Sequence, residues 1–240
     1  MKILYKYPTR GRPIKFTKCL FEYFRLMDEK DNFEIVVSVD NDDPVMNNPE
    51  MINFLNEIPN LKYCFSDNRS KIEAINADIP DSDWDILVLI SDDMIPEVKG
   101  FDNIIRQKME EHYPDTDGVL WFFDGWRKDL NTLCILGRKY YDRFGYIYHP
   151  SYESFWSDAE FTDVANLLNK QTYFDQVIIR HLHPDIVMQD EKTAKKFANL
   201  FPEYANKGSA GHDGLWQKNS IEGDPDHKVY LDRKEKGFNL

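Results

Sequence analysis

An apolar run that stops at two adjacent carboxylates constrains the fold of this chain most. The segment 84–96, WDILVLISDDMIP, is typical of a buried strand followed at once by Ser91, Asp92 and Asp93. In open parallel sheets, ligands bind outside the carboxyl ends of the strands, so we expect these side chains to face a crevice. Their oxygens suit a hard divalent cation shared with a substrate phosphate. Ordinary turn chemistry is the alternative, with Asp92 capping the turn and Asp93 solvated.

Strand-like and helix-like segments alternate along the first half of the chain. We expect strands at 2–7, 34–39, 61–65, 85–90 and 118–123, and helices at 13–29, 49–57, 69–77 and 101–112. This alternation predicts parallel strands joined by helical crossovers. The predicted fold class is therefore α/β, with a mostly parallel central sheet flanked by helices.

The pattern becomes less regular beyond Asp124. We expect an extended segment at 132–136, a short helix at 138–144, an aromatic loop at 146–156, a helix at 158–169 with Asp158 as its N-cap, a strand at 173–180 and a helix at 191–200. The Gly-, Lys- and Asp-rich tail that follows is either a lid over the site or a disordered end, and composition alone favours neither.

Composition narrows the class of protein. The chain has 240 residues, of which 42% are hydrophobic, enough for one large domain. A formal net charge of −12 disfavours a dedicated nucleic-acid binder, whose affinity comes mainly from neutralising phosphates. Cys19, Cys64 and Cys134 lack the paired spacing of a zinc site or a disulfide framework, which favours a reducing compartment. We see no apolar run of signal-peptide or membrane-span length, so we expect a cytoplasmic protein.

Three further groups of polar residues lie beside the same predicted sheet edge. The first follows the first strand, the second is the acid that ends the second strand, and the third lies on the helix at 69–77: Pro8, Thr9 and Arg10; Asp40; and Arg69, Lys71 and Asn76. Backbone amides, guanidinium groups and an acid in such places suit a nucleotide with its phosphates. Taken singly, the same residues are as typical of Asx turns and solvated helix faces.

Taken together and in order, these segments resemble GT-A glycosyltransferases, especially the large family 2 type. The matching segments are PTRGRP, SVDNDDP, NRSKIEAINADIP, LISDDM and SDAEF, within about residues 1–185. The resemblance implies a GT-A, Rossmann-like domain in which residues 1–124 bind a nucleotide-sugar donor and residues 125–185 form an irregular acceptor half. Residues 186–240 are then a C-terminal helix and tail, a candidate lid.

Carried over residue by residue, the resemblance implies roles for the polar groups. Pro8, Thr9 and Arg10 would border the nucleoside, and Asp40 would contact the base or ribose. Arg69, Lys71, Asn76 and Ser91 would lie near the rest of the donor. Asp158 is the expected catalytic base that activates the acceptor hydroxyl, and Glu160 is the second candidate.

The resemblance also implies Mn²⁺ or Mg²⁺ bridging the donor diphosphate to an acid, any residue, acid motif. Here Ile90 stands in the place of the first acid, so the metal site depends on Asp92 with help from Asp93. In several GT-A enzymes a late histidine completes the shell, which makes His183 the candidate and His181 the reserve. Imidazole suits Mn²⁺ better than Mg²⁺. Ordinary hydrogen-bonded histidines are the alternative.

The sequence thus predicts a metal-dependent glycosyltransferase that moves a sugar from a nucleotide-diphosphate donor to an acceptor hydroxyl, with inversion implied by the resemblance. A UDP-sugar is the first guess for the donor. A nucleotidyltransferase, which attacks phosphorus instead of carbon, and a non-catalytic nucleotide-sugar or glycan-binding module are the alternatives. The sugar, the oligomeric state and the acceptor, whether glycan, protein, small molecule or modified base, stay open.

Overall fold

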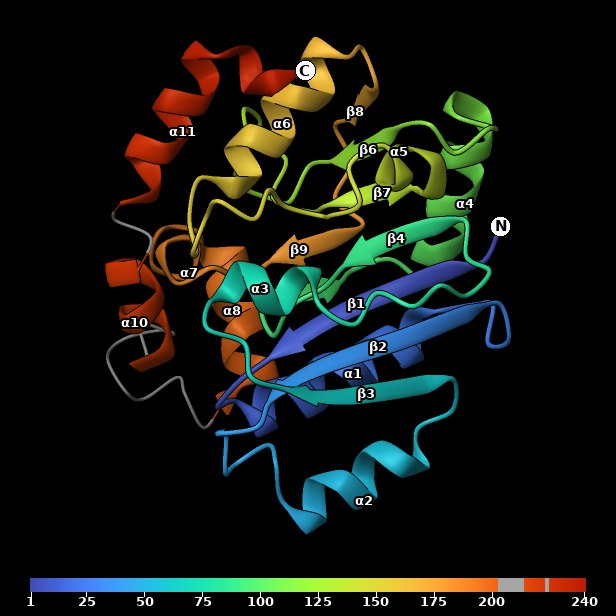
Figure 1. The fold of residues 1–240 in the computed structure, drawn as a ribbon. Helices are drawn as coiled ribbons and strands as arrows, with labels where there is room; N and C mark the ends of the chain where they lie inside the picture. The colour runs from blue at the N-terminus through green and yellow to red at the C-terminus, as the bar shows by residue number, and fades with distance from the viewer. Residues whose placement is uncertain (203–213, 223–224) are drawn as a thin grey trace.

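A central seven-stranded sheet carries helices on both faces in this computed structural model, which describes residues 1–202, 214–222 and 225–240 (Figure 1). In spatial order the strands are β3 (Leu61–Ser66), β2 (Phe33–Asp40), β1 (Ile3–Thr9), β4 (Ile86–Leu89), β7 (Ile135–Gly137), β6 (Val119–Phe122) and β8 (Gln171–Phe174). The strands β1 to β4 run parallel, whereas β7 is antiparallel to both of its neighbours. The predicted mostly parallel α/β sheet is confirmed.

A second, two-stranded sheet lies at the carboxyl end of β4. It pairs β5 (Met94–Pro96) with β9 (Ile179–His181) in antiparallel register, with Met94 opposite His181. The strand predicted at 173–180 is wrong as one element, because the chain leaves β8 at Phe174 and enters β9 in a different sheet. β5 was not predicted, since three residues are too few to show a period.

The helices divide between the two faces of the sheet. They are α1 (Pro13–Leu26), α2 (Pro49–Glu57), α3 (Lys71–Asn76), α4 (Phe101–His112), α5 (Arg138–Asp142), α6 (Ser157–Leu167), α7 (Pro184–Gln189), α8 (Glu191–Leu200), α10 (Gly214–Glu222) and α11 (Asp226–Glu235), with a 3₁₀ turn at Gly237–Asn239. α1 and α3 lie on opposite faces of β1 and β2 (Figure 1).

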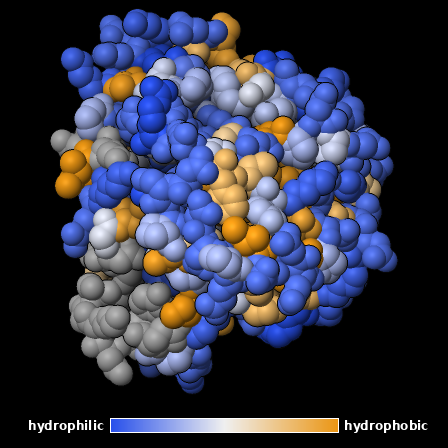
Figure 2. Space-filling model, turned by 60° about the horizontal axis from the view of Figure 1, so that its bottom comes forward, coloured by the Kyte–Doolittle hydropathy of each residue, from blue (hydrophilic) through white to orange (hydrophobic). Residues whose placement is uncertain are grey.

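Two hydrophobic cores result, one on each face of the sheet. Side chains alternate along β1, so Tyr5 packs with α1 and α4 in one core while Leu4 packs with α3 in the other. Strands buried on both faces read as continuous apolar runs, which is the pattern of β4. The face in Figure 2 is largely hydrophilic, with apolar side chains gathered in small groups near its centre.

Local signals explain where several helices begin. α1 has Pro13 at its first position, and α2 is capped by the Asn48 side chain, which accepts a hydrogen bond from the Met51 N–H. The prediction that Asp158 caps α6 is wrong. α6 already begins at Ser157, after Trp156 in a left-handed conformation with φ of 63°, so Asp158 lies inside the first turn.

The C-terminal region is folded against the domain. In α11, the Arg233 guanidinium donates to both carboxylate oxygens of Glu160 on α6, at 2.6 and 2.8 Å. The Tyr230 hydroxyl donates to Asp163, also on α6, at 2.7 Å. The predicted tail therefore contains helices, although residues 203–213 and 223–224 lie outside the described part. Within that part, no helix combines the length and apolar character needed to cross a membrane.

Arg233→Met tests this anchor. The Arg233 and Glu160 side chains are only 13% and 5% exposed. Removing one partner of a buried ion pair leaves an uncompensated charge, so we expect the free energy of unfolding to fall by roughly 3 kcal/mol. Urea unfolding measures the change.

Lys128→Met is the matched control, because its pair with Asp175 is 59% and 61% exposed. Exposed pairs are worth at most about 1 kcal/mol. Equal losses from the two substitutions would show that the α11 anchor does not depend on the buried pair.

Candidate functional site

A cavity of about 370 Å³ lies at the carboxyl ends of β1, β2 and β4. Its walls come from the β1–α1 turn, the start of α3, residues 126–132, the aromatic loop and the start of α6, the end of β9, and α10. The arrowheads of β1, β2 and β3 in Figure 1 point to this side of the molecule. The apolar strands thus carry polar strand-end residues to one place, as expected of an open parallel sheet.

The first predicted group meets Asp40 at one end of the cavity, where Pro8, Thr9 and Arg10 also line the wall. The Arg10 guanidinium donates to one Asp40 oxygen at 2.7 Å, and Asn68 Nδ2 donates to the other at 3.0 Å. Arg10 also pairs with Asp42. Asp40 is therefore held in place by side chains from two other segments.

α3 brings a cation to the middle of the cavity. Ser70 caps this helix by accepting a hydrogen bond from the Glu73 N–H at 3.1 Å, which places Lys71 in the first turn. The Lys71 ammonium lies 6.0 Å from the centre of the Phe155 ring, inside the wall. Arg69 reaches only the rim, because its side chain is 85% exposed and pairs with Glu73.

Asn76 does not line the cavity, which corrects its predicted place beside the donor. Its Oδ1 accepts from the N–H groups of Ile147 and Tyr148 at 2.9 and 3.1 Å, and its Nδ2 donates to the Tyr148 carbonyl at 2.7 Å. Asn76 therefore holds the backbone of the aromatic loop, from which Tyr148 reaches the cavity.

The strand-end acids have different surroundings. Asp92 accepts hydrogen bonds from the Tyr7 hydroxyl at 3.1 Å and from Thr9 Oγ1 at 3.3 Å, and Arg12 Nη1 lies 3.9 Å away. Burial raises the pKa of Asp92 to about 6. Ile90, which replaces the first acid of the motif, is fully buried in the core. Asp92 therefore interacts with side chains of β1 and with Arg12, the residue before α1.

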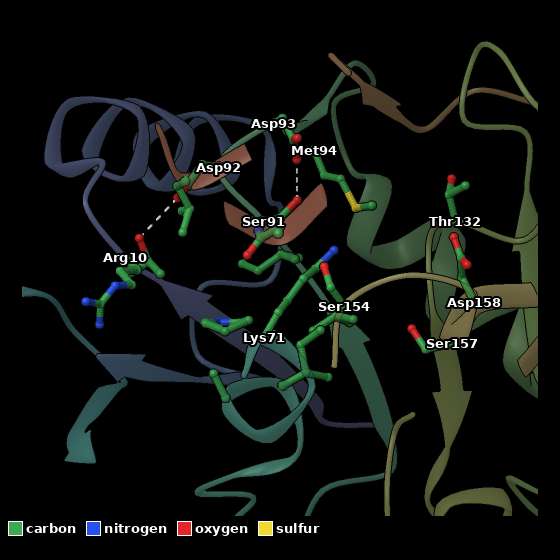
Figure 3. A pocket seen from close by; sticks show the side chains of 18 of the residues that line it. Arg10, Lys71, Ser91, Asp92, Asp93, Met94, Thr132, Ser154, Ser157 and Asp158 are labelled. Carbon is green, nitrogen blue, oxygen red and sulfur yellow. Dashed lines mark hydrogen bonds between the residues drawn. The ribbon is translucent and has the colours of Figure 1, made fainter. Parts of the chain in front are cut away.

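Asp93 faces His181. The carboxylate Oδ2 lies 3.7 Å from His181 Nε2, while Ser91 donates a hydrogen bond to Oδ1 (Figure 3). Burial alone would raise the pKa of Asp93, but His181 and Ser91 together hold it well below its usual value. Burial lowers the pKa of His181, but the neighbouring carboxylates of Asp93 and Asp124 outweigh it and raise the pKa to about 9.

Asp124 is the second acid beside His181, and it was not predicted. Its Oδ2 lies 3.7 Å from His181 Nδ1, too far for a hydrogen bond, and it accepts from Thr132 Oγ1 at 2.7 Å. Its other oxygen accepts from the N–H groups of Trp126 and Arg127 at 2.7 and 2.8 Å. Asp124 follows the predicted strand at 118–123, so the same strand-end signal could have identified it.

His183, the predicted metal ligand, lies farther along the same wall. Its ring stacks on Trp126 with 5.8 Å between centroids, and its Nδ1 accepts from the Asp185 N–H at 3.3 Å. Burial lowers its pKa. The pairing of β5 with β9 brings His181, the reserve candidate, to Asp93 instead.

The donor set can be compared with the divalent cation that the resemblance implies. Among the described residues, no three His, Cys, Asp or Glu side chains come together closely enough to hold a metal ion. Asp93 and His181 form a carboxylate–imidazole pair, and His181 Nδ1 is buried without a hydrogen-bond partner in that part of the chain. This pair would fit a divalent cation such as Mn²⁺ if water and a substrate diphosphate supplied the remaining ligands.

The two predicted bases lie in different places. Asp158 lines the cavity beside Thr132 and Ser157, across from Asp92 (Figure 3). Burial raises its pKa, and Lys71 partly opposes the shift. Glu160 does not line the cavity, because its carboxylate faces α11 and accepts from Arg233 and from the Tyr152 hydroxyl. Glu160 is therefore an anchor for α11, which corrects its prediction as a second catalytic candidate.

Solved structures with the same fold are known although no family model and no curated protein matches the sequence. Residues 1–349 of S. aureus TarS in complex with UDP-GlcNAc match at a TM-score of 0.60 with 16% identity, over 83% of this chain and 67% of that one. The mannosyltransferase PcManGT from Pyrobaculum calidifontis, in complex with GDP-Man and Mn²⁺, matches at a TM-score of 0.61 with 13% identity. The match covers 97% of this chain and 68% of PcManGT.

This chain covers only 40% of a longer TarS structure and 66% of another structure of TarS residues 1–349. The chain therefore spans two thirds or less of several of these proteins. At these identities the likeness concerns the fold alone. It confirms that the chain has the GT-A glycosyltransferase fold.

Asn76→Ala tests the support of the aromatic loop. The substitution removes three hydrogen bonds and leaves partly buried backbone groups without partners, so we expect a loss of roughly 2 kcal/mol in the free energy of unfolding. Asn56→Ala is the control, since Asn56 is exposed and, among the described residues, its side chain accepts from the Tyr63 hydroxyl and makes no other hydrogen bond. It should change stability by less than about 0.5 kcal/mol. Urea unfolding compares them, and similar values would contradict the role of Asn76.

Proposed function

We propose that this protein is a glycosyltransferase that moves a sugar from a nucleotide-diphosphate donor to an acceptor hydroxyl. The observation that carries the proposal is the order of groups along the cavity. Arg10, which donates a hydrogen bond to Asp40, lies at one end, Lys71 and Asp93 lie in the middle, and Asp158 lies at the other end (Figure 3). That order suits a nucleoside, a diphosphate and a sugar with its acceptor.

The neighbouring structures support a donor of this class, since one is a complex with UDP-GlcNAc and another a complex with GDP-Man and Mn²⁺. In this chain, Asp40 would accept from the base or ribose, and the Lys71 ammonium would neutralise charge on the diphosphate. A UDP-sugar remains the first donor to test. Residues 1–124 would form the donor half and residues 125–185 the acceptor half.

Asp93 and His181 would hold the divalent cation, with Asp124 behind the imidazole to orient it. When bound, Mn²⁺ would stabilise the negative charge that develops on the leaving diphosphate. Within the chain, Ser91 keeps the Asp93 carboxylate turned toward His181.

Asp158 would act as the general base. Its carboxylate would take the proton of the acceptor hydroxyl while that oxygen attacks the anomeric carbon, and a pKa raised by burial makes it a better base. Attack from the side opposite the diphosphate inverts the configuration at that carbon. The α10 residues Leu215, Lys218 and Asn219 contribute to the wall and would restrict the access of water, in keeping with a lid role for this helix.

Product analysis tests the proposal. The protein is incubated with Mn²⁺ and UDP-glucose, UDP-GlcNAc or GDP-mannose, and separately with nucleoside triphosphates. Release of a nucleoside diphosphate from a nucleotide sugar supports sugar transfer. Pyrophosphate released only from the triphosphates would indicate a nucleotidyltransferase, and binding without turnover would indicate a non-catalytic module.

Comparing Asp158→Asn with Glu160→Gln tests which of these two α6 carboxylates is the general base. Loss of a general base should lower turnover by roughly 10²- to 10⁴-fold while the affinity for the donor stays the same. Glu160→Gln should lower the melting temperature and leave turnover near normal, because Glu160 faces Arg233. Turnover by steady-state kinetics and donor affinity by calorimetry decide, and near-normal transfer by Asp158→Asn would exclude it as the base.

His181→Ala tests the cation site. Because loss of even an outer partner of a metal ligand costs about 10- to 100-fold in affinity, removing the imidazole should raise the Mn²⁺ concentration for half-maximal activity by roughly tenfold or more. His183→Ala should shift it less, since the His183 ring stacks on Trp126 and its Nδ1 accepts from the Asp185 N–H. Electron paramagnetic resonance of Mn²⁺ with UDP present gives an independent measure. A larger shift in the Mn²⁺ requirement for His183→Ala than for His181→Ala would indicate that His183 is the metal ligand.

A further inference from the structure

Ser154 carries a hydroxyl that is buried but has no partner. The residue is 2% exposed and lines the cavity, and among the described residues Ser154 Oγ has no hydrogen-bond partner. Buried polar atoms without a partner are rare, since folding then removes a group from water with nothing in exchange. A hydroxyl of this kind in the wall of a binding cavity points to a ligand group as the missing partner.

The backbone around Ser154 is held by an acid from the far end of the chain. The carboxylate of Asp226, at the start of α11, is 1% exposed and accepts from the N–H groups of Glu153, Ser154 and Phe155 at 3.0, 2.8 and 2.9 Å. On the other side, the Glu153 carbonyl accepts from the Ile72 N–H of α3 at 3.3 Å. The loop is fixed between α3 and α11, so the hydroxyl is pre-positioned.

Ser154 also lies between the groups assigned to the two halves of the reaction. In Figure 3 it is next to Lys71, with Asp158 beyond it. Its neighbour Phe155 lies under the Lys71 ammonium. If Lys71 faces the diphosphate and Asp158 faces the acceptor hydroxyl, the sugar in transfer lies between them and beside Ser154.

We propose that Ser154 Oγ hydrogen-bonds a hydroxyl of the transferred sugar and helps to select the donor, with Asp226 as the residue that positions it. A serine hydroxyl both donates and accepts, so it matches a sugar hydroxyl, and it adds no charge to the diphosphate site. This inference rests on the proposed function. It adds that the protein recognises the sugar part of the donor through one of its hydroxyl groups.

Calorimetry on Ser154→Ala separates the sugar from the nucleotide. With Mn²⁺ present, wild type and variant are titrated with UDP-glucose, UDP-GlcNAc and GDP-mannose, and with UDP and GDP alone. For the nucleotide sugar that wild type binds most tightly, we expect Ser154→Ala to bind about 5- to 10-fold more weakly, with the affinity for its free diphosphate unchanged. Ser151→Ala, an exposed serine outside the cavity, is the matched control and should change neither value.

Each other outcome has a separate meaning. Equal affinities for the nucleotide sugar in wild type and Ser154→Ala would overturn the proposal and show that Ser154 Oγ meets only water. A wild type that binds every nucleotide sugar no more tightly than its free diphosphate would overturn the sugar contact and leave the proposed function to the product analysis. A wild type that binds neither nucleotide sugars nor free diphosphates would overturn the proposed function.

Asp226→Asn tests the positioning residue. Asparagine keeps the shape, but its NH₂ group replaces one of the two acceptor oxygens and the negative charge is lost. Either the bond from the Glu153 N–H to Oδ1 or the bonds from all three N–H groups to Oδ2 are then broken. We expect the same selective loss of affinity for the nucleotide sugar, with the affinity for the free diphosphate retained. If only the melting temperature falls, Asp226 is a structural residue and its positioning role is wrong.

Discussion

The parallel pairing of β1 with β2 and β4 is the constraint on which the rest of the structure depends. Tyr5 of β1 lies opposite Ile35 of β2 on one side and Val88 of β4 on the other, so the carboxyl ends of the three strands lie at the same edge of the sheet. Because the strands are buried on both faces, a one-residue shift of register would move the side chains of each core to the opposite face and disrupt the packing of both cores. The fixed register brings Thr9, Asp40 and the acids that follow β4 to one edge, where the cavity forms.

A short antiparallel pair then decides which groups share the middle of the cavity. β5 and β9 together have six residues, yet their pairing sets Met94 opposite His181 and so places the imidazole at Asp93. The Leu182 N–H also donates to the Asp93 carbonyl at 2.6 Å. Asp124, at the end of β6, holds the turn at Trp126 and faces the same imidazole. Two acids and one histidine from three segments thus form a single electrostatic unit.

The C-terminal helix completes the opposite wall by a different kind of interaction. Arg233 and Glu160 form a buried, bidentate ion pair. Asp226 accepts hydrogen bonds from three backbone N–H groups of the aromatic loop. Such buried pairs add little net stability over apolar packing, but they specify one arrangement of the elements that carry them. We infer that α11 contributes to the cavity through the loop at 153–155, although no residue of α11 lines the cavity itself.

Most of the regular elements and the chemistry of the sheet edge follow from the sequence alone. The helices at 49–57, 101–112 and 191–200 have the predicted bounds, because periodicity and caps depend on residues a few positions apart. Tertiary structure decided which side chains face the cavity. Asn76 and Glu160 had plausible sequence patterns, but their partners are about 70 residues away, at Tyr148 and Arg233. Such contacts leave no local pattern, since they arise only when the packed layers bring distant segments together.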